Sequence, residues 1–135
     1  MIPYPTKIKK FSGTSYSEVR KSANDLFKQI KSKTKRRPYI KSAYFNKQKI
    51  FFDFFWQHLF EKPFKERVRR LKYFGCAIDL IKNSKNDPIS FENPCRHSEI
   101  LHRFTGLSKE KELFYVQIKE NKKTNKKYLM SVFPE

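Results

Sequence analysis

The clearest indication of the fold is the segment Leu113-Phe114-Tyr115-Val116-Gln117-Ile118-Lys119. Successive side chains of an extended strand point to opposite faces, so Phe114, Val116 and Ile118 fall on one face of this segment. Strict alternation over several residues is typical of a strand that is half-buried in a sheet. The segment therefore predicts a strand with one face on the hydrophobic core.

Two neighbouring segments extend this strand into a sheet. Glu99–Phe104 precedes it and also alternates, while Lys127–Phe133 follows the polar turn Glu120–Asn125. Consecutive strands joined by short links pair in antiparallel order. We expect a three-stranded antiparallel meander in the last third of the chain.

The first helix is predicted from its start signal and its spacing. Ser15-Tyr16-Ser17-Glu18 matches a capping box, and apolar residues recur at helical spacing behind it. We expect a helix over Tyr16–Lys33, followed by a basic run that Pro38 closes. Residues 1–14, which precede it, are basic and predict an extended arm, so residues 15–135 form one domain.

The middle of the chain predicts a hairpin and two more helices. Tyr39–Phe45 and Lys49–Phe52 are rich in aromatic and β-branched residues, which favours a β-hairpin. Phe54–Glu61 predicts a short helix, and Phe64–Lys82 has the apolar spacing of one long amphipathic helix. Asn83–Asn93 is polar and predicts a loop. The predicted fold class is α+β: an N-terminal helix, a β-hairpin and a long amphipathic helix packed on an antiparallel sheet ending in a three-stranded meander.

The charge of the chain indicates a polyanionic partner. Its 135 residues carry 31 Lys and Arg against 13 acidic residues, a formal net charge of +18. Lys and Arg are almost never fully buried without a partner, so the surface carries a strong positive field. Nucleic acid, and RNA in particular, is the expected partner. No apolar segment approaches the length of a membrane span, and the predicted location is cytoplasmic.

The sequence offers little for a metal or a cofactor. The acidic residues are scattered, and no glycine-rich phosphate loop is present, so no cofactor is predicted. Cys76, Cys95, His97 and His102 leave a zinc site open, although their spacing matches no paired ligand motif. Cys76 alternatively lies in a helical pattern as a buried thiol.

Cleavage of RNA without a metal needs groups that move protons and cations that stabilise charge on phosphorus. His58 suits a proton-transfer role, because it lies near Lys62 and Arg67 and imidazole titrates near neutrality. The alternative for His58 is that it ends a helix and bonds a carbonyl group. His102 and Arg103 share a predicted strand, where a histidine alternatively packs in the sheet.

Further residues are candidates for contact with RNA because of the chemistry of their side chains. Ser131, in the last strand, has a hydroxyl that either bonds a phosphate oxygen or faces a neighbouring strand. Most aromatic residues must form the core, but Tyr44 and Trp56 have polar tips that suit a solvated edge for base stacking. The basic candidates for backbone contacts are Arg36, Arg37, Arg69, Arg70, Lys119, Lys122, Lys123, Lys126 and Lys127.

The run from His58 to Ser131 resembles small nucleases related to barnase, EndoU, colicin nucleases and RelE, often found on phages and mobile elements. The resemblance lies in the order of a His, a basic residue with Pro (Lys62-Pro63), an early helical Arg67, three strands and a last-strand hydroxyl. It implies helices on a four-stranded antiparallel sheet. It also implies a metal-independent ribonuclease, often a toxin with an inhibitory partner.

Three functions follow as alternatives. The first is a toxin-like endoribonuclease that uses the 2′-hydroxyl as nucleophile, with His58 as base or acid, Arg67 and His102 or Arg103 stabilising charge, and Ser131 holding a phosphate oxygen. The second is a non-catalytic nucleic-acid-binding protein. The third is a basic protein that docks on an acidic partner, such as an antitoxin or immunity protein.

Overall fold

Three long consecutive strands form the centre of the fold in the computed structural model, which describes residues 2–135. They are β5 (Glu99–Leu107), β6 (Leu113–Asn121) and β7 (Lys127–Pro134), paired in antiparallel order. Phe104, Val116 and Val132 stand opposite one another across the strands, and all three are buried. The predicted meander is therefore confirmed, and its alternation faces the core as expected.

The predicted hairpin extends this sheet beyond β7. It comprises β2 (Tyr39–Ser42) and β3 (Gln48–Phe51), whose turn contains Asn46 and Lys47 with φ of 56° and 64°. β3 pairs with β7 in parallel, but only over two residue pairs at the start of β7. Within residues 2–135, no strand pairs with the rest of that edge of β7.

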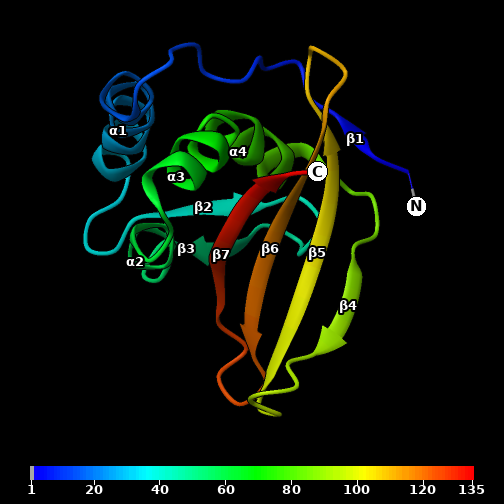
Figure 1. The fold of residues 1–135 in the computed structure, drawn as a ribbon. Helices are drawn as coiled ribbons and strands as arrows, with labels where there is room; N and C mark the ends of the chain where they lie inside the picture. The colour runs from blue at the N-terminus through cyan, green and yellow to red at the C-terminus, as the bar shows by residue number, and fades with distance from the viewer. Residues whose placement is uncertain (1) are drawn as a thin grey trace.

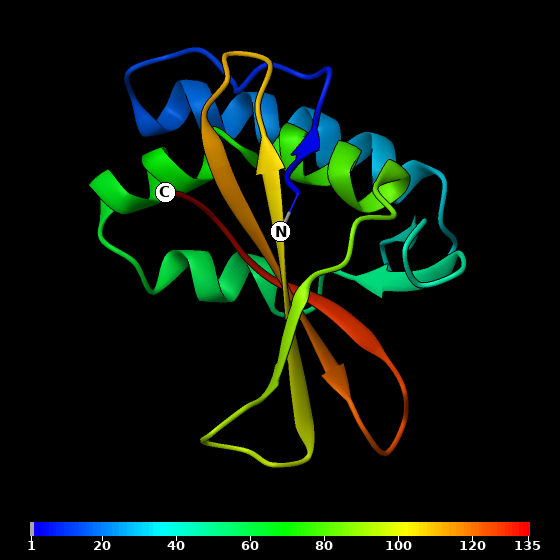
Figure 2. The same ribbon diagram turned by 90° about the vertical axis from the view of Figure 1, so that its right-hand side faces the viewer.

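Within the described part of the chain, residues 2–135, four helices lie beside the sheet. α1 (Tyr16–Ser32) packs on α3 (Phe64–Leu71), and α4 (Phe74–Asn83) contacts β2 and β5, while α2 (Phe55–Phe60) packs beside β7. Figures 1 and 2 show α1, α3 and α4 gathered on one side of the long strands, whose other ends project beyond the helices. The α+β fold class is therefore confirmed.

The capping box at the start of α1 is present as predicted. The Ser15 hydroxyl accepts a hydrogen bond from the Glu18 backbone N–H, and the Glu18 carboxylate accepts one from the Ser15 backbone N–H. Val19, Ala23 and Ile30 form the buried stripe of the helix. Local signals alone set the start of this helix, so its prediction needed no knowledge of tertiary contacts.

The long helix predicted after Pro63 is wrong in one respect: two helices replace it. α3 ends before Lys72 and α4 begins after Tyr73. The Lys72 carbonyl accepts a hydrogen bond from the backbone N–H of Phe11 at 2.8 Å, which takes an acceptor that a continuous helix would use internally. The break comes from a contact with a distant segment, which local periodicity cannot report.

The N-terminal segment and the segment after α4 both contain strands that sequence reasoning missed. β1 (Tyr4–Pro5) pairs in parallel with the end of β5, and Thr6 donates its hydroxyl to Asp79. β4 (Ile89–Glu92) lies in the predicted loop and pairs in antiparallel order with the first half of β5. Both are short edge strands. β1 has only two residues, and in β4 Ile89 and Phe91 alternate with polar residues over four exposed positions, so neither gives an alternation long enough to indicate a half-buried strand.

Within residues 2–135, no helix has the length and apolar character needed to cross a membrane.

Candidate functional site

His58 is held at the margin of the sheet by its own short helix. Phe55 and Leu59 are buried and anchor α2, which leaves His58 on the flank of the helix with 32% of its side chain exposed. Its Nδ1 lies 3.6 Å from a Glu61 carboxylate oxygen. Burial, and then the positive charge of Lys62, lower the pKa of His58 below its usual value. The imidazole is therefore neutral at pH 7 and able to accept a proton.

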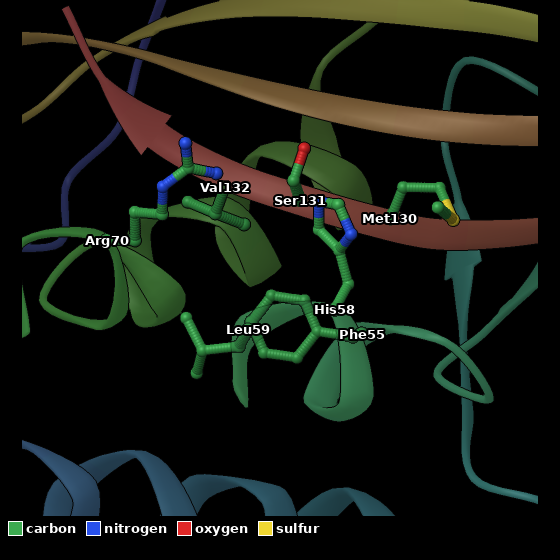
Figure 3. Close-up of a pocket in the computed structure, with 7 residues that line it drawn as sticks. All are labelled: Phe55, His58, Leu59, Arg70, Met130, Ser131 and Val132. Atoms are coloured by element: carbon green, nitrogen blue, oxygen red, sulfur yellow. The ribbon is translucent and has the colours of Figure 1, made fainter. Parts of the chain in front are cut away.

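The free edge of β7 and the two helices beside it enclose a small cavity of about 10 Å³, roughly the room that one water molecule needs. Figure 3 shows the His58 ring reaching toward β7 close to Ser131, while the Arg70 side chain extends toward the same strand from α3. No carboxylate lines the cavity among the described residues. Its lining comprises Phe55, His58, Leu59, Arg70, Met130, Ser131 and Val132.

Ser131 belongs to a row of polar side chains that crosses the sheet. It stands opposite Gln117 on β6, which stands opposite Arg103 on β5. Arg103 donates to the Gln117 side-chain oxygen at 3.2 Å, and its Nε is buried without a partner within residues 2–135. The Ser131 hydroxyl forms no hydrogen bond with the residues described. The row therefore retains unused hydrogen-bonding capacity beside the cavity.

Arg70 connects the cavity to this row. Its Nε donates to Glu66 at 3.0 Å, which fixes the side chain, and Glu66 has a lowered pKa through that bond. The guanidinium groups of Arg70 and Arg103 lie 5.4 and 5.6 Å from the centre of the Phe133 ring. Two cations thus approach one aromatic ring on β7, two positions along the strand from Ser131.

Arg67, which the resemblance placed in the site, is used elsewhere. Its guanidinium donates to the backbone carbonyl groups of Phe60 and Lys62, at 2.5 and 2.7 Å. It also lies 4.6 Å from the centre of the Phe64 ring. Arg67 therefore closes the turn between α2 and α3, where it positions the helix that carries His58.

His102 lies on the opposite face of β5 from Arg103 and is not brought together with His58. Its Nδ1 is 2.7 Å from the Ser90 hydroxyl and its Nε2 is 2.8 Å from a Glu120 carboxylate oxygen. The ring is only 8% exposed and packs edge-on against Phe45, 5.0 Å between centroids. Of the two alternatives for His102, this placement corresponds to a histidine that packs in the sheet.

Lys127 extends the same network and is buried. Its Nζ donates to the side chains of Gln48 and Asn125 and lies 4.0 Å from a Glu120 carboxylate oxygen. Burial lowers the pKa of Lys127. The lysine, predicted to contact nucleic acid, instead ties the β2–β3 hairpin to the β6–β7 turn.

The residues of the zinc hypothesis do not converge. Cys76 is buried in α4, and burial raises the pKa of its thiol to about 12, whereas Cys95 is exposed. His97 pairs with Glu92 at 2.6 Å. In the part of the chain that the structure describes, no three His, Cys, Asp or Glu side chains form a group able to hold a metal ion.

The other predicted nucleic-acid contacts fall into two groups. In the first group Arg37 pairs with Asp53, Arg69 with Glu66, Lys119 with Glu99 and Lys122 with Glu92, so carboxylates partly neutralise these four. The second group, Arg36, Lys123 and Lys126, is exposed and has no carboxylate within 4 Å among residues 2–135.

Both aromatic residues predicted to stack on bases belong largely to the core. Tyr44 packs against Phe104, 5.5 Å between ring centroids, and Trp56 packs against Phe74 at the same separation. The indole Nε1 of Trp56 is buried without a partner within residues 2–135. Both rings are partly buried against the core, which leaves only part of each side chain exposed.

Sequence reasoning missed two features of the site. It assigned Arg70 only to backbone binding, and it did not single out Gln117. The alternation of β6 places Gln117 on the face away from the core, but its partners depend on the register between strands. A β-bulge between Gln117 and Ile118 shifts the pairing of β6 with β7, and no local sequence pattern indicates this bulge.

Comparison with protein-family models, with curated proteins and with solved structures found no match to this chain, so the function is argued from the site itself.

Proposed function

We propose that the protein is a metal-independent endoribonuclease with its site at the edge of β7. The observation that carries the proposal is the meeting of His58, Arg70 and Ser131 around one cavity, with each residue supplied by a different element. Arg103 adds a second cation on the same cross-strand row as Ser131. This set contains a proton acceptor, two cations and a hydroxyl, which are the groups that transesterification of RNA requires.

The proposed reaction uses the neutral imidazole of His58 as general base. It takes the proton of the ribose 2′-hydroxyl, whose oxygen then bonds to phosphorus as the bond to the 5′-oxygen breaks. The departing 5′-oxygen takes a proton from solvent or from the Lys62 ammonium. The products are a 2′,3′-cyclic phosphate and a 5′-hydroxyl, so atoms and charge balance without a further reactant.

The cations act on the charge that develops at phosphorus. Arg70 is held by Glu66 and by the Phe133 ring, which limits the side-chain reorganisation needed when the phosphorane forms. Ser131 and the unpartnered N–H of Arg103 offer hydrogen bonds to phosphate oxygens. In this proposal Arg70 takes the charge-stabilising role first expected of Arg67.

The test is incubation of total RNA with the purified protein in EDTA. Wild type should cleave and release 2′,3′-cyclic phosphate ends, and His58→Ala should lose cleavage by roughly 10²–10⁴-fold while retaining RNA binding. Arg70→Gln should lose at least roughly 10²-fold. The matched control is Arg69→Gln, because Arg69 binds the same Glu66 carboxylate but does not line the cavity.

Two results would redirect the assignment. Equal cleavage by wild type and His58→Ala would show that the base lies elsewhere. If wild type binds RNA but never cuts it, the non-catalytic nucleic-acid-binding protein replaces the enzyme. Binding of either kind should weaken log-linearly with salt concentration.

The toxin role and the acidic inhibitory partner are part of the same proposal. Small size, the charge of +18 and the nuclease site support it. Expression of wild type in bacteria should arrest growth, whereas expression of His58→Ala should not. Harmless expression of an active wild-type enzyme would contradict the toxin role and leave the nuclease proposal standing.

A further inference from the structure

A second basic surface, separate from the His58 cavity, lies where the loop after α1 meets the hairpin. The loop between α1 and β2 runs along the outer margin of the fold (Figure 1). With β2 and β3 it borders an open groove of about 610 Å³. The groove residues that matter here are Lys33, Lys35, Arg36, Arg37, Lys49 and Phe51.

Most of the basic side chains in this groove have no carboxylate partner among residues 2–135. Lys33, Lys35 and Arg36 are exposed, and within residues 2–135 none has a carboxylate within 4 Å. Lys49 lies 4.7 Å from the Tyr39 ring centre and likewise has no carboxylate partner in the described chain. Because these four cations have no carboxylate partner within residues 2–135, the groove attracts phosphate groups strongly.

Arg37 gives the groove a flat, fixed surface. Asp53 accepts a hydrogen bond from its guanidinium, which lies 4.3 Å from the centre of the Phe51 ring. One face of the guanidinium thus rests on an aromatic ring and one edge is bound to a carboxylate. The side chain is still 40% exposed. A planar cation held in this way is suited to stack on an unpaired base.

The groove leads toward the cavity along β7. Phe51 stands opposite Tyr128 in the parallel pair, and Arg37 lies 6.0 Å from the Tyr128 ring centre. Tyr128 precedes Ser131 by three positions on the same strand, a separation of roughly 10 Å at the rise of an extended chain. One strand therefore connects the two surfaces.

We infer that this groove, which we call the Arg37 groove, is a subsite for single-stranded RNA. Arg37 stacks on an unpaired base, while Lys33, Lys35 and Arg36 contact the backbone that continues toward the His58 cavity. The inference rests on the proposed function, since it assigns to the groove the strand that flanks the cleaved bond. It predicts a preference for unpaired RNA over a duplex, because stacking on Arg37 requires a free base face.

The test measures binding of a short fluorescent 2′-O-methyl oligonucleotide, which cannot be cleaved at its 2′-oxygen, as a single strand and as a duplex. Arg37→Lys keeps the charge and loses the flat face. It should weaken single-strand binding by about 5- to 100-fold with no change in the salt slope, and leave duplex binding unchanged.

The backbone contacts are tested separately. The triple variant Lys33→Gln/Lys35→Gln/Arg36→Gln should reduce the slope of log affinity against log salt by about 2, at roughly 0.7 for each contact to a single strand. The matched control is Lys7→Gln/Lys9→Gln/Lys109→Gln, which removes the same charge from exposed positions just after β1 and β5, at the opposite edge of the sheet from the β2–β3 hairpin. It should leave the slope unchanged.

The outcomes separate this inference from the proposed function. Equal losses in the two triple variants, or an Arg37→Lys variant that binds like wild type, would overturn the subsite. Equal losses on single strand and duplex would show simple charge attraction and would also overturn it. Failure of the nuclease proposal gives a different pattern. Wild type would leave unmodified RNA intact in the cleavage assay, while the groove variants would still bind the probe less well than wild type.

Discussion

Replacing His102 with alanine is expected to cost about 3–5 kcal/mol of folding free energy while leaving the His58 cavity assembled. His102 makes hydrogen bonds to Ser90 and Glu120 and packs on Phe45. Truncation removes both bonds, leaves the Glu120 carboxylate short of a donor, and opens a cavity where the ring was. A hydrogen bond contributes about 1 kcal/mol net, or about 1.5–3 with a charged partner, and the lost ring packing adds the remainder.

Urea unfolding, followed by the fluorescence of the single tryptophan, measures this cost. With a slope of about 1–3 kcal/mol per molar urea, the midpoint should fall by roughly 1–5 M. The matched control is His97→Ala, because the His97 side chain is 81% exposed and contacts Glu92 only as an exposed ion pair. Its midpoint should be that of wild type.

Cleavage of RNA in EDTA, at a low temperature where both proteins are folded, completes the experiment. Activity per folded molecule should be the same for His102→Ala and wild type. A variant as stable as wild type but unable to cleave would refute the reasoning, because His102 would then take part in the chemistry. An unchanged urea midpoint alone would show that the buried network does not stabilise the fold.

Three further predictions concern separate parts of the molecule. Because the pKa of His58 is lowered, the proposed general base is already neutral at pH 7. The cleavage rate should therefore be independent of pH above 6.5 and should fall at lower pH, as His58 gains a proton. A fall in rate centred above pH 6.5 would contradict this prediction. Gly106→Ala should destabilise the fold by about 1–3 kcal/mol, because a Cβ at this position would lie 2.3 Å from the Phe114 ring. Phe114→Leu should then cost less stability in the Gly106→Ala protein than in wild type. If urea unfolding shows that the two costs simply add, the clash is excluded. A thiol reagent should modify Cys95 rapidly in the native protein and Cys76 only after unfolding, so fast reaction of two thiols would show that α4 is not packed as described.

The elements that the sequence predicted are those specified by local chemistry. The capping box at Ser15 starts α1, and the alternation of Leu113–Lys119 identifies β6 and its buried face. Neither depends on what lies far along the chain. The break at Lys72 and the strand β1 depend on distant partners, so neither left a local signal.

The sequence predicted some of the residues in the candidate site, but it could not predict how these residues are arranged. The order of residues from His58 to Ser131 indicated two groups that the fold brings to one cavity. Arg67 and Arg70 lie on the same helix, and only the carbonyl groups of the α2–α3 turn decide that Arg67 faces away. His102 and Arg103 are adjacent in sequence, and the pleat of β5 sends them to opposite faces.

The parallel pairing of β1 with β5 governs the order in which this chain reaches its native state. A strand at Tyr4 emerges from the ribosome early, and its partner at Gly106 follows only after all four helices. Until then the first residues have no edge to join, and closing so long a loop carries an entropic cost. Native structure therefore completes late, at a rate set by long-range topology. Because β7 supplies one wall of the His58 cavity, the proposed site cannot assemble before this last strand has been synthesised.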